Sequence, residues 1–180
     1  MTITKSGSAD EWHMSSLVVL AFEKMDGAEA MRERLYDLQK RELLTLEDAA
    51  VVVRQENGHA KVKQAHSLVG AGALGGAFWG MLVGLLFFAP WLGLVAGAAG
   101  GALSGKLADI GIDDSFIDEV SETIEPGSSA LFLLTRDAQL ERIEAELADF
   151  EYEFGIIQTN LSPADETKLR ETFAAEEIDG

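Results

Sequence analysis

Two ladders of glycine constrain most strongly what this chain can fold into. They lie in an apolar block, residues 67–107, whose only hydroxyl-bearing or charged side chains are Ser67, Ser104 and Lys106. The ladders are two sets of glycines four residues apart: Gly72, Gly76, Gly80 and Gly84, then Gly93, Gly97, Gly101 and Gly105. This interval puts each set on one side of a helix, where the missing side chains let a second helix approach closely.

The apolar block therefore predicts a glycine-zipper helical hairpin over residues 67–108. A glycine inside a solvated helix costs about 1 kcal/mol relative to alanine, so two such helices form only where packing or an apolar environment supports them. Large side chains occupy the remaining surface, and five of them are candidate membrane or core anchors: Trp79, Phe87, Phe88, Pro90 and Trp91. A monomer does not expose an apolar patch of this size. We expect the hairpin to be hidden in a bilayer or in a homo-oligomer.

The length of the block suits a membrane. Residues 68–88 number 21 and residues 91–107 number 17, against about 20 for a spanning helix. The predicted turn, residues 87–93, holds no polar residue, so its tip would stop at the far interface, inside the membrane or against sister chains. Lys61, Lys63 and Lys106 near the hairpin ends favour a cytoplasmic side for the rest of the chain. The alternative is a soluble assembly that buries the hairpins in its interior.

The flanking sequence has an ordinary globular pattern. Short apolar runs predict strands at 17–22, 49–54, 129–134 and 153–159, and Asn57-Gly58 predicts a hairpin that pairs 59–64 with the second strand. Helical spacing predicts helices at 28–43, 113–124, 137–150 and 163–175, the first with an Asp26–Glu29 capping box. The order predicts an α+β fold: a ferredoxin-like sandwich whose four-stranded sheet carries helices on one face.

These elements divide the chain into four parts. Residues 1–13 are a polar tail without the apolar run of a signal peptide, and residues 14–66 are the first half of the sandwich. Residues 67–108 are the inserted hairpin. Residues 109–180 are the second half with a C-terminal helix.

Charge limits the partners of the protein. The chain carries 31 acidic and 14 basic residues, a net charge of −17. Such a surface repels nucleic acid and anionic lipid headgroups, so membrane contact would be hydrophobic. The chain has no cysteine, which excludes disulfides and thiolate chemistry.

The polar residues do not predict an enzyme. His13, His59 and His66 have no partners at metal-ligand spacing. Asp109, Asp113 and Asp114 form an acidic group, for which helix capping by Asp113 and Asp114 is favoured over a cation site. Glu141, Glu144 and Glu146 are expected to form a solvated helix face. We expect no catalytic residue, no metal and no cofactor.

Several segments resemble one uncharacterised bacterial family. The start at Met14-Ser15-Ser16-Leu17-Val18-Val19, both glycine ladders, residues 107–116 (LADIGIDDSF) and residues 125–132 (EPGSSALF) carry the likeness. The chain is similar over residues 14–160 to the domain of unknown function 1269, whose members are labelled predicted membrane proteins. The resemblance implies a bacterial origin and a membrane location, and no activity.

Three functions remain as expectations. The first is a membrane-associated homo-oligomer in the bacterial inner membrane, with its sandwich in the cytoplasm, that stabilises or remodels the membrane under stress. The second is a soluble cytoplasmic homo-oligomer whose buried hairpins hold lipid or another hydrophobic guest. The third is a small-molecule-sensing regulatory module, which needs a polar pocket beside the sheet.

Overall fold

The computed structural model describes residues 15–43, 45–64, 79–80, 82–84, 86–87, 105, 108–109, 112–136, 145–161 and 164. Its elements are β1 (Ser15–Phe22), α1 (Gly27–Lys40), β2 (Thr45–Arg54), β3 (Ala60–Gln64), α4 (Asp114–Thr123), β4 (Ser129–Arg136) and β5 (Phe154–Leu161). All five strands lie within a few residues of the predicted positions. The predicted α+β class is confirmed.

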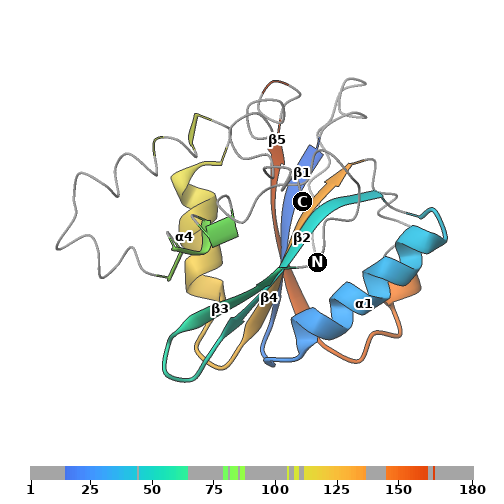
Figure 1. Ribbon diagram of the computed structural model, residues 1–180, viewed down its shortest axis with the longest axis horizontal. Helices are drawn as coiled ribbons and strands as arrows, with labels where there is room; N and C mark the ends of the chain where they lie inside the picture. The colour runs from blue at the N-terminus through green and yellow to red at the C-terminus, as the bar shows by residue number, and fades with distance from the viewer. Residues whose placement is uncertain are drawn as a thin grey trace, which may run out of the picture.

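The five strands form one antiparallel sheet in the order β3-β2-β4-β1-β5 (Figure 1). The central strands, β2, β4 and β1, each contain a continuous apolar run of five or six residues. β1, for example, reads Leu-Val-Val-Leu-Ala-Phe from Leu17 to Phe22. Since neighbouring residues of a strand point to opposite faces, such runs are typical of a sheet buried on both sides.

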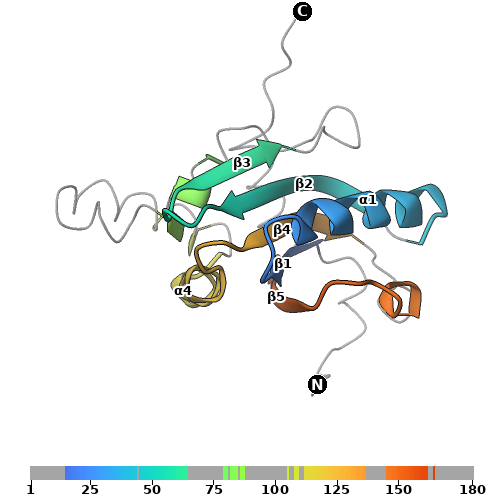
Figure 2. The same ribbon diagram turned by 90° about the horizontal axis from the view of Figure 1, so that it is seen from below.

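Two separate apolar cores cover the two faces. The α1 face is packed by α1 and by residues near β5, and its strand residues include Leu20, Phe22, Val51, Leu131 and Leu133. The α4 face is packed by α4 and by part of the apolar block, and its strand residues include Leu17, Val19, Val52, Phe132 and Leu134. Figures 1 and 2 show α1 and α4 on opposite sides of the sheet.

The expectation of helices on one face of the sheet is therefore wrong. The physical reason lies in the central strands. Alternate residues of β1, β2 and β4 are apolar on both faces, and leaving either face in water would expose a full row of them. The chain uses α4 and residues of the apolar block to cover the second face.

The first helix begins where predicted, but the capping box is wrong. Asp26 is the N-cap residue and makes no side-chain cap hydrogen bond. Glu29 instead forms an ion pair with Arg32. The Ala28 N–H donates to the Ser129 Oγ (3.1 Å), which in turn donates to the Lys24 carbonyl (2.5 Å). A buried hydroxyl of β4 thus caps the helix in place of the local side chain.

The predicted Asn57-Gly58 turn and the Asp113 cap are confirmed. Gly58 has a positive φ of 83°, which glycine adopts without strain, and so does Gly127, at 87°. Asp113 is the N-cap of α4, and its carboxylate accepts from the Phe116 N–H (2.9 Å) and the Ser115 hydroxyl (2.6 Å). These two hydrogen bonds lower the pKa of Asp113, the Ser115 bond having the larger effect. These contacts show that Asp113 acts as a helix cap, the role favoured from the sequence.

Glu146, which is half-buried, is paired with Arg41. Arg41 at the end of α1 donates to both of its carboxylate oxygens (2.5 and 2.7 Å), and Arg34 donates to its backbone carbonyl (2.8 Å). The hydrogen bond from Arg41 is the main cause that lowers the pKa of Glu146. These contacts attach the helical turn at residues 145–147 to α1. Several predicted features lie outside the described residues: Glu141 and Glu144, most of the helix 137–150, all of the helix 163–175 except residue 164, and the tail 1–13.

The Arg41–Glu146 pair predicts a pH-dependent stability. Because pairing lowers the pKa of Glu146, it stabilises the fold above the ordinary glutamate pKa of about 4.3, and the contribution disappears as pH falls through the lower folded-state pKa. Glu146→Gln should therefore reduce the free energy of unfolding at pH 7 and have a smaller effect at pH 3, where more of the Glu146 side chain is protonated. Urea denaturation at both pH values measures the difference. Asp37→Asn, which breaks the more exposed Lys40–Asp37 pair, is the control and should have the smaller effect.

Candidate functional site

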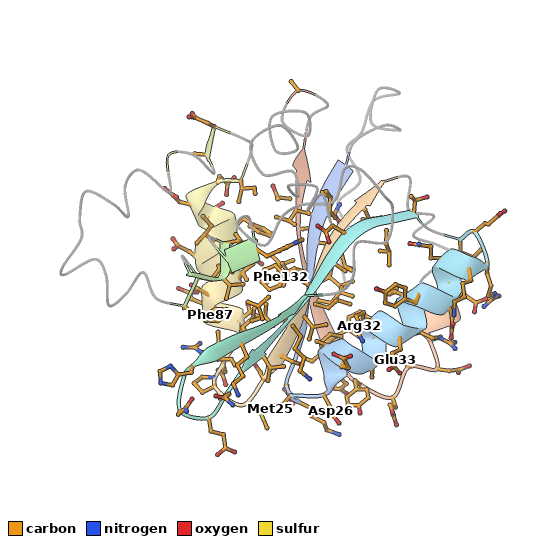
Figure 3. All side chains as sticks on the ribbon, viewed as in Figure 1. Met25, Asp26, Arg32, Glu33, Phe87 and Phe132 are labelled. Carbon is orange, nitrogen blue, oxygen red and sulfur yellow. The ribbon has the colours of Figure 1, made fainter. Side chains whose placement is uncertain are left out.

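Part of the apolar block packs on the α4 face of the sheet. The described residues between 79 and 87 are helical, and we call them the docked segment: Trp79, Gly80, Leu82, Val83, Gly84, Leu86 and Phe87. All five large side chains of the segment are at most 7% exposed, and all belong to the core of the α4 face. Burial of five such side chains stabilises the packing by roughly 10 kcal/mol. Figure 3 shows Phe87 and Phe132 on the side of the sheet that carries α4.

The glycines of the docked segment lie on its other side. Gly80 is exposed and Gly84 is half-buried. No atom of the described residues lies within 4 Å of a Cβ placed on either glycine. The segment therefore has a large-residue face against the sheet and a glycine face directed away from it.

The structure describes only some of the predicted site residues. Trp79, Phe87, Gly80 and Gly84 belong to the docked segment, and Gly105 is exposed with open space around it among the described residues. The others lie outside the described residues: Gly72, Gly76, Gly93, Gly97, Gly101, Phe88, Pro90 and Trp91. Among the residues described, no helix is long and apolar enough to cross a membrane.

A buried carboxylate faces the docked segment because β2 contains a β-bulge. Leu46 pairs with Thr135 and Asp48 pairs with Leu134, so residue 47 is an extra residue in the strand. In a regular strand Leu46 and Asp48 would point to the same face. Here Leu46 lies in the core of the α1 face, while the Asp48 carboxylate, in a residue 3% exposed, reaches Trp79 on the other side.

Trp79 joins the docked segment to two strands. Its indole Nε1–H donates to Asp48 Oδ2 of β2 (3.1 Å), and its ring packs edge-on against Phe132 of β4, with ring centroids 6.1 Å apart. The second carboxylate oxygen, Asp48 Oδ1, accepts from the Ala49 N–H (2.8 Å). The carboxylate thus has one acceptor position for its own strand and one for the docked segment.

Arg54 lies near the other end of the segment. Its guanidinium is 5.2 Å from the centroid of the Phe87 ring, and its Nη1 donates to the Ile124 carbonyl at the end of α4 (2.5 Å). Along β2, Asp48, Ala50, Val52 and Arg54 face the docked segment. Asp48 and Arg54 therefore lie at the two ends of a short apolar row, the floor, formed by Ala50 and Val52.

Asp48 and Arg54 are not among the residues predicted for a site. The predicted strand, 49–54, leaves Asp48 outside and has Arg54 as its last residue. The available signal was the alternation Asp-Ala-Val-Arg at positions 48, 50, 52 and 54, with charges only at its ends. The bulge that directs this row to one face has no clear mark in the sequence.

A separate pocket of about 580 Å³ opens where β1 ends and β5 begins. Its lining residues include Phe22, which is 2% exposed, Phe154, and three glutamates from distant parts of the chain, Glu23, Glu125 and Glu153. Among the described residues, no lysine, arginine or histidine lines it. Lys24, beside Glu23 in sequence, places its ammonium over the Tyr152 ring (5.2 Å).

In the described part of the chain, no group of three or more His, Cys, Asp or Glu side chains is placed to hold a metal ion. Asp109 and Asp114 are exposed, as is His59. His13 and His66 lie outside the described residues.

The Asp48–Trp79 contact predicts a measurable coupling. Trp79→Phe keeps the aromatic ring but withdraws a donor from a buried carboxylate, which should destabilise the fold by about 1–3 kcal/mol. Asp48→Leu should cost less in the Trp79→Phe background than in the parent, because the hydrogen bond between the two side chains is already lost there. Urea denaturation of the two single variants and the double variant measures this. Additive effects would show that the two side chains do not depend on each other.

Comparison with known proteins places the chain in one family. The sequence model of a family described as "Protein of unknown function (DUF1269)" matches residues 73–174, a range that includes the docked segment, α4, β4 and β5. No curated protein and no solved structure gives a significant match. Since the matched range covers more than half of the 180 residues, the chain belongs to the DUF1269 family of proteins of unknown function.

Proposed function

We propose that this protein is a non-enzymatic homo-oligomer that assembles through the glycine faces of its apolar helices. The observation that carries the proposal is the two-sided docked segment. Its large residues are covered by the chain's own sheet, while Gly80 and Gly84 are directed away from it with open space among the described residues. A glycine face is suited to contact with a second helix at backbone distance.

The docked geometry also bears on where the assembly resides. The sequence predicts that the large residues of the apolar block need an apolar neighbour, and lipid is one candidate. For the described residues from Trp79 to Phe87, the sheet is that neighbour. This favours a soluble homo-oligomer that encloses the rest of the apolar block, with membrane association as its competitor for residues 88–107. Fractionation of a lysate without detergent separates the two, since only the membrane form sediments with vesicles.

We also propose that the sheet and its helices form a ferredoxin-like unit with an added edge strand. The spatial order β2-β4-β1-β5, with α1 between β1 and β2, supports this assignment. β3 would then be an addition at the β2 edge. The apolar block would be an insertion between the two halves of the unit that covers its otherwise open face.

The glycine face gives a direct test. Gly80→Leu places a large side chain where the described residues leave open space, so within that part of the chain it creates no clash. It also replaces a poor helix former with a good one, a gain of up to about 1 kcal/mol. If a sister helix packs on this face, overpacking costs about 1–3 kcal/mol at each contact. We expect Gly80→Leu and Gly97→Leu to lower the particle mass measured by light scattering, while far-UV circular dichroism stays that of a folded domain.

Matched variants control for the change in side-chain size. Gly80→Ala keeps a small residue and should assemble nearly as the parent does. Leu82→Ile changes a buried residue on the opposite face and should leave the particle mass unchanged. If the leucine variants assemble as well as the parent, the glycine faces are not packing surfaces and the proposal is wrong.

The second candidate function is a small-molecule-sensing module, which the pocket between β1, α4 and β5 favours. Three carboxylates, with no base among the described lining residues, suit an organic cation, because carboxylates attract positive charge. Spermidine is a suitable probe, titrated at low salt by calorimetry. Its binding should weaken in Glu125→Gln and Glu153→Gln and remain in Glu33→Gln, which removes the same charge from the exposed surface of α1. Equal weakening in all three variants would indicate attraction to the acidic surface only.

A further inference from the structure

We propose that Trp79, through its buried ring and its hydrogen bond to Asp48, fixes the register in which the docked segment lies on the sheet. The register has a consequence for assembly, because it decides which glycines face outward, and only this consequence rests on the proposed function. The register itself is a property of one chain and can be measured separately.

The apolar block is repetitive enough to dock in a second register. If the helix slips by four residues, Gly76 and Gly80 take the places of Gly80 and Gly84, so the glycine face is preserved. On the buried face, Phe78, Trp79, Leu82 and Val83 take the places of Leu82, Val83, Leu86 and Phe87. Four of five buried positions therefore remain apolar and large. At these four positions hydrophobic burial discriminates poorly between the two registers.

The fifth position is different. In the slipped register Gly75 takes the place of Trp79, and a glycine has no side-chain donor for the Asp48 carboxylate. The carboxylate is buried, with its residue 3% exposed, so the loss of a donor is costly. The Ala49 N–H would still donate to Oδ1, because that bond lies within β2 and does not depend on the helix. Position 79 therefore separates the registers where the other four positions do not, because the slip removes both the buried Trp79 ring and its hydrogen bond to Asp48.

The opposite slip is excluded by the sequence. A shift by four residues in the other direction brings Pro90 to the place of Leu86, inside the helix. Proline there removes a backbone hydrogen bond and clashes with the preceding turn. The competing state is thus a single one, displaced along the helix axis by about 6 Å at 1.5 Å per residue.

A buried polar contact that selects one of several apolar arrangements is known from coiled coils, where one polar pair at the interface sets the register. The β-bulge has the corresponding role here. It turns Asp48 to the α4 face, at the end of the floor formed by Ala50 and Val52. Without the bulge, Asp48 would share the face of Leu46 and could not reach Trp79.

The register can be measured by spin-label distances, because the chain has no native cysteine. One label at Gly80→Cys reports the outward side of the segment, and a second at Lys61→Cys on β3 or Asp118→Cys on α4 reports the domain. All three positions are exposed. The Lys61–Asp118 pair lies wholly outside the segment and shows whether the domain remains folded. Labelled chains are diluted with an excess of unlabelled chain, so that only distances within one chain are recorded.

In the parent we expect one narrow distance from Gly80 to each domain label. Asp48→Leu removes the acceptor and Trp79→Phe removes the donor while keeping the ring. In both, the ratio of slipped to native register should rise by about ten- to a hundredfold, the equivalent of one hydrogen bond to a charged group, and a second distance should appear. Leu82→Ala, which removes buried apolar volume without a polar contact, should keep the single distance.

If Trp79→Phe retains the parent distance with an intact domain pair, shape complementarity fixes the register and the proposal is overturned. If Asp48→Leu disturbs the domain pair, Trp79→Phe alone decides, since it leaves the strand unchanged. The distances report the geometry of one chain and the particle mass reports assembly. If the Trp79→Phe variant slips but the parent does not oligomerise, only the proposed function is contradicted. If the parent oligomerises but the Trp79→Phe variant does not slip, only this inference is contradicted.

Discussion

The structure depends on a sheet that needs an apolar cover on both faces. β1, β2 and β4 are its central strands, and consecutive residues in each are apolar, so either face alone would leave a row of Val, Leu and Phe side chains in water. α1 covers one face with residues at helical spacing, Ala28, Met31, Leu35 and Leu38. α4 contributes Phe116, Ile117 and Val120 to the other face, with the docked segment beside it. The glycine-rich block is therefore an integral layer of the domain in its described part.

That layer explains how the chain accommodates so apolar a segment. Its five large residues bury against the sheet, and its glycines remain on the opposite side. The two faces have different partners: strands for the large residues, and another helix for the glycines in the function we propose. Asp48 and Arg54, at the two ends of the β2 face, add polar contacts to an interface that would otherwise have little directional preference. The family is described only as one of unknown function. The pocket between β1, α4 and β5 is the feature that supports the second candidate function, a small-molecule-sensing module.

Much of the fold followed from local patterns. The strands at 17–22, 129–134 and 153–159, the Asn57-Gly58 turn, the Asp113 cap and the buried residues of α1 and α4 are all local in origin, and the structure contains them. The failures concern contacts between distant residues. The Asp26–Glu29 capping box was replaced by Ser129, which is 101 residues from the Ala28 N–H that it accepts. Glu146 was expected in solvent and is paired with Arg41, 105 residues away. The central strands contain continuous apolar runs, which indicate a sheet that is covered on both faces. The prediction of helices on one face did not take these runs into account.

The sequence by itself determined which segments are strands and helices, because hydrophobic periodicity, caps and turn glycines act within a few residues. It also determined that the apolar block has a large-residue side and a glycine side, because both follow from four-residue spacing. Only the tertiary structure decided which side meets the sheet, and that the sheet provides a face for it at all. The β-bulge at residues 46–48, which turns Asp48 toward Trp79, arises from pairing with β4. Such choices depend on which surfaces meet, and the physical reason is that burial is shared between elements that lie far apart in the chain.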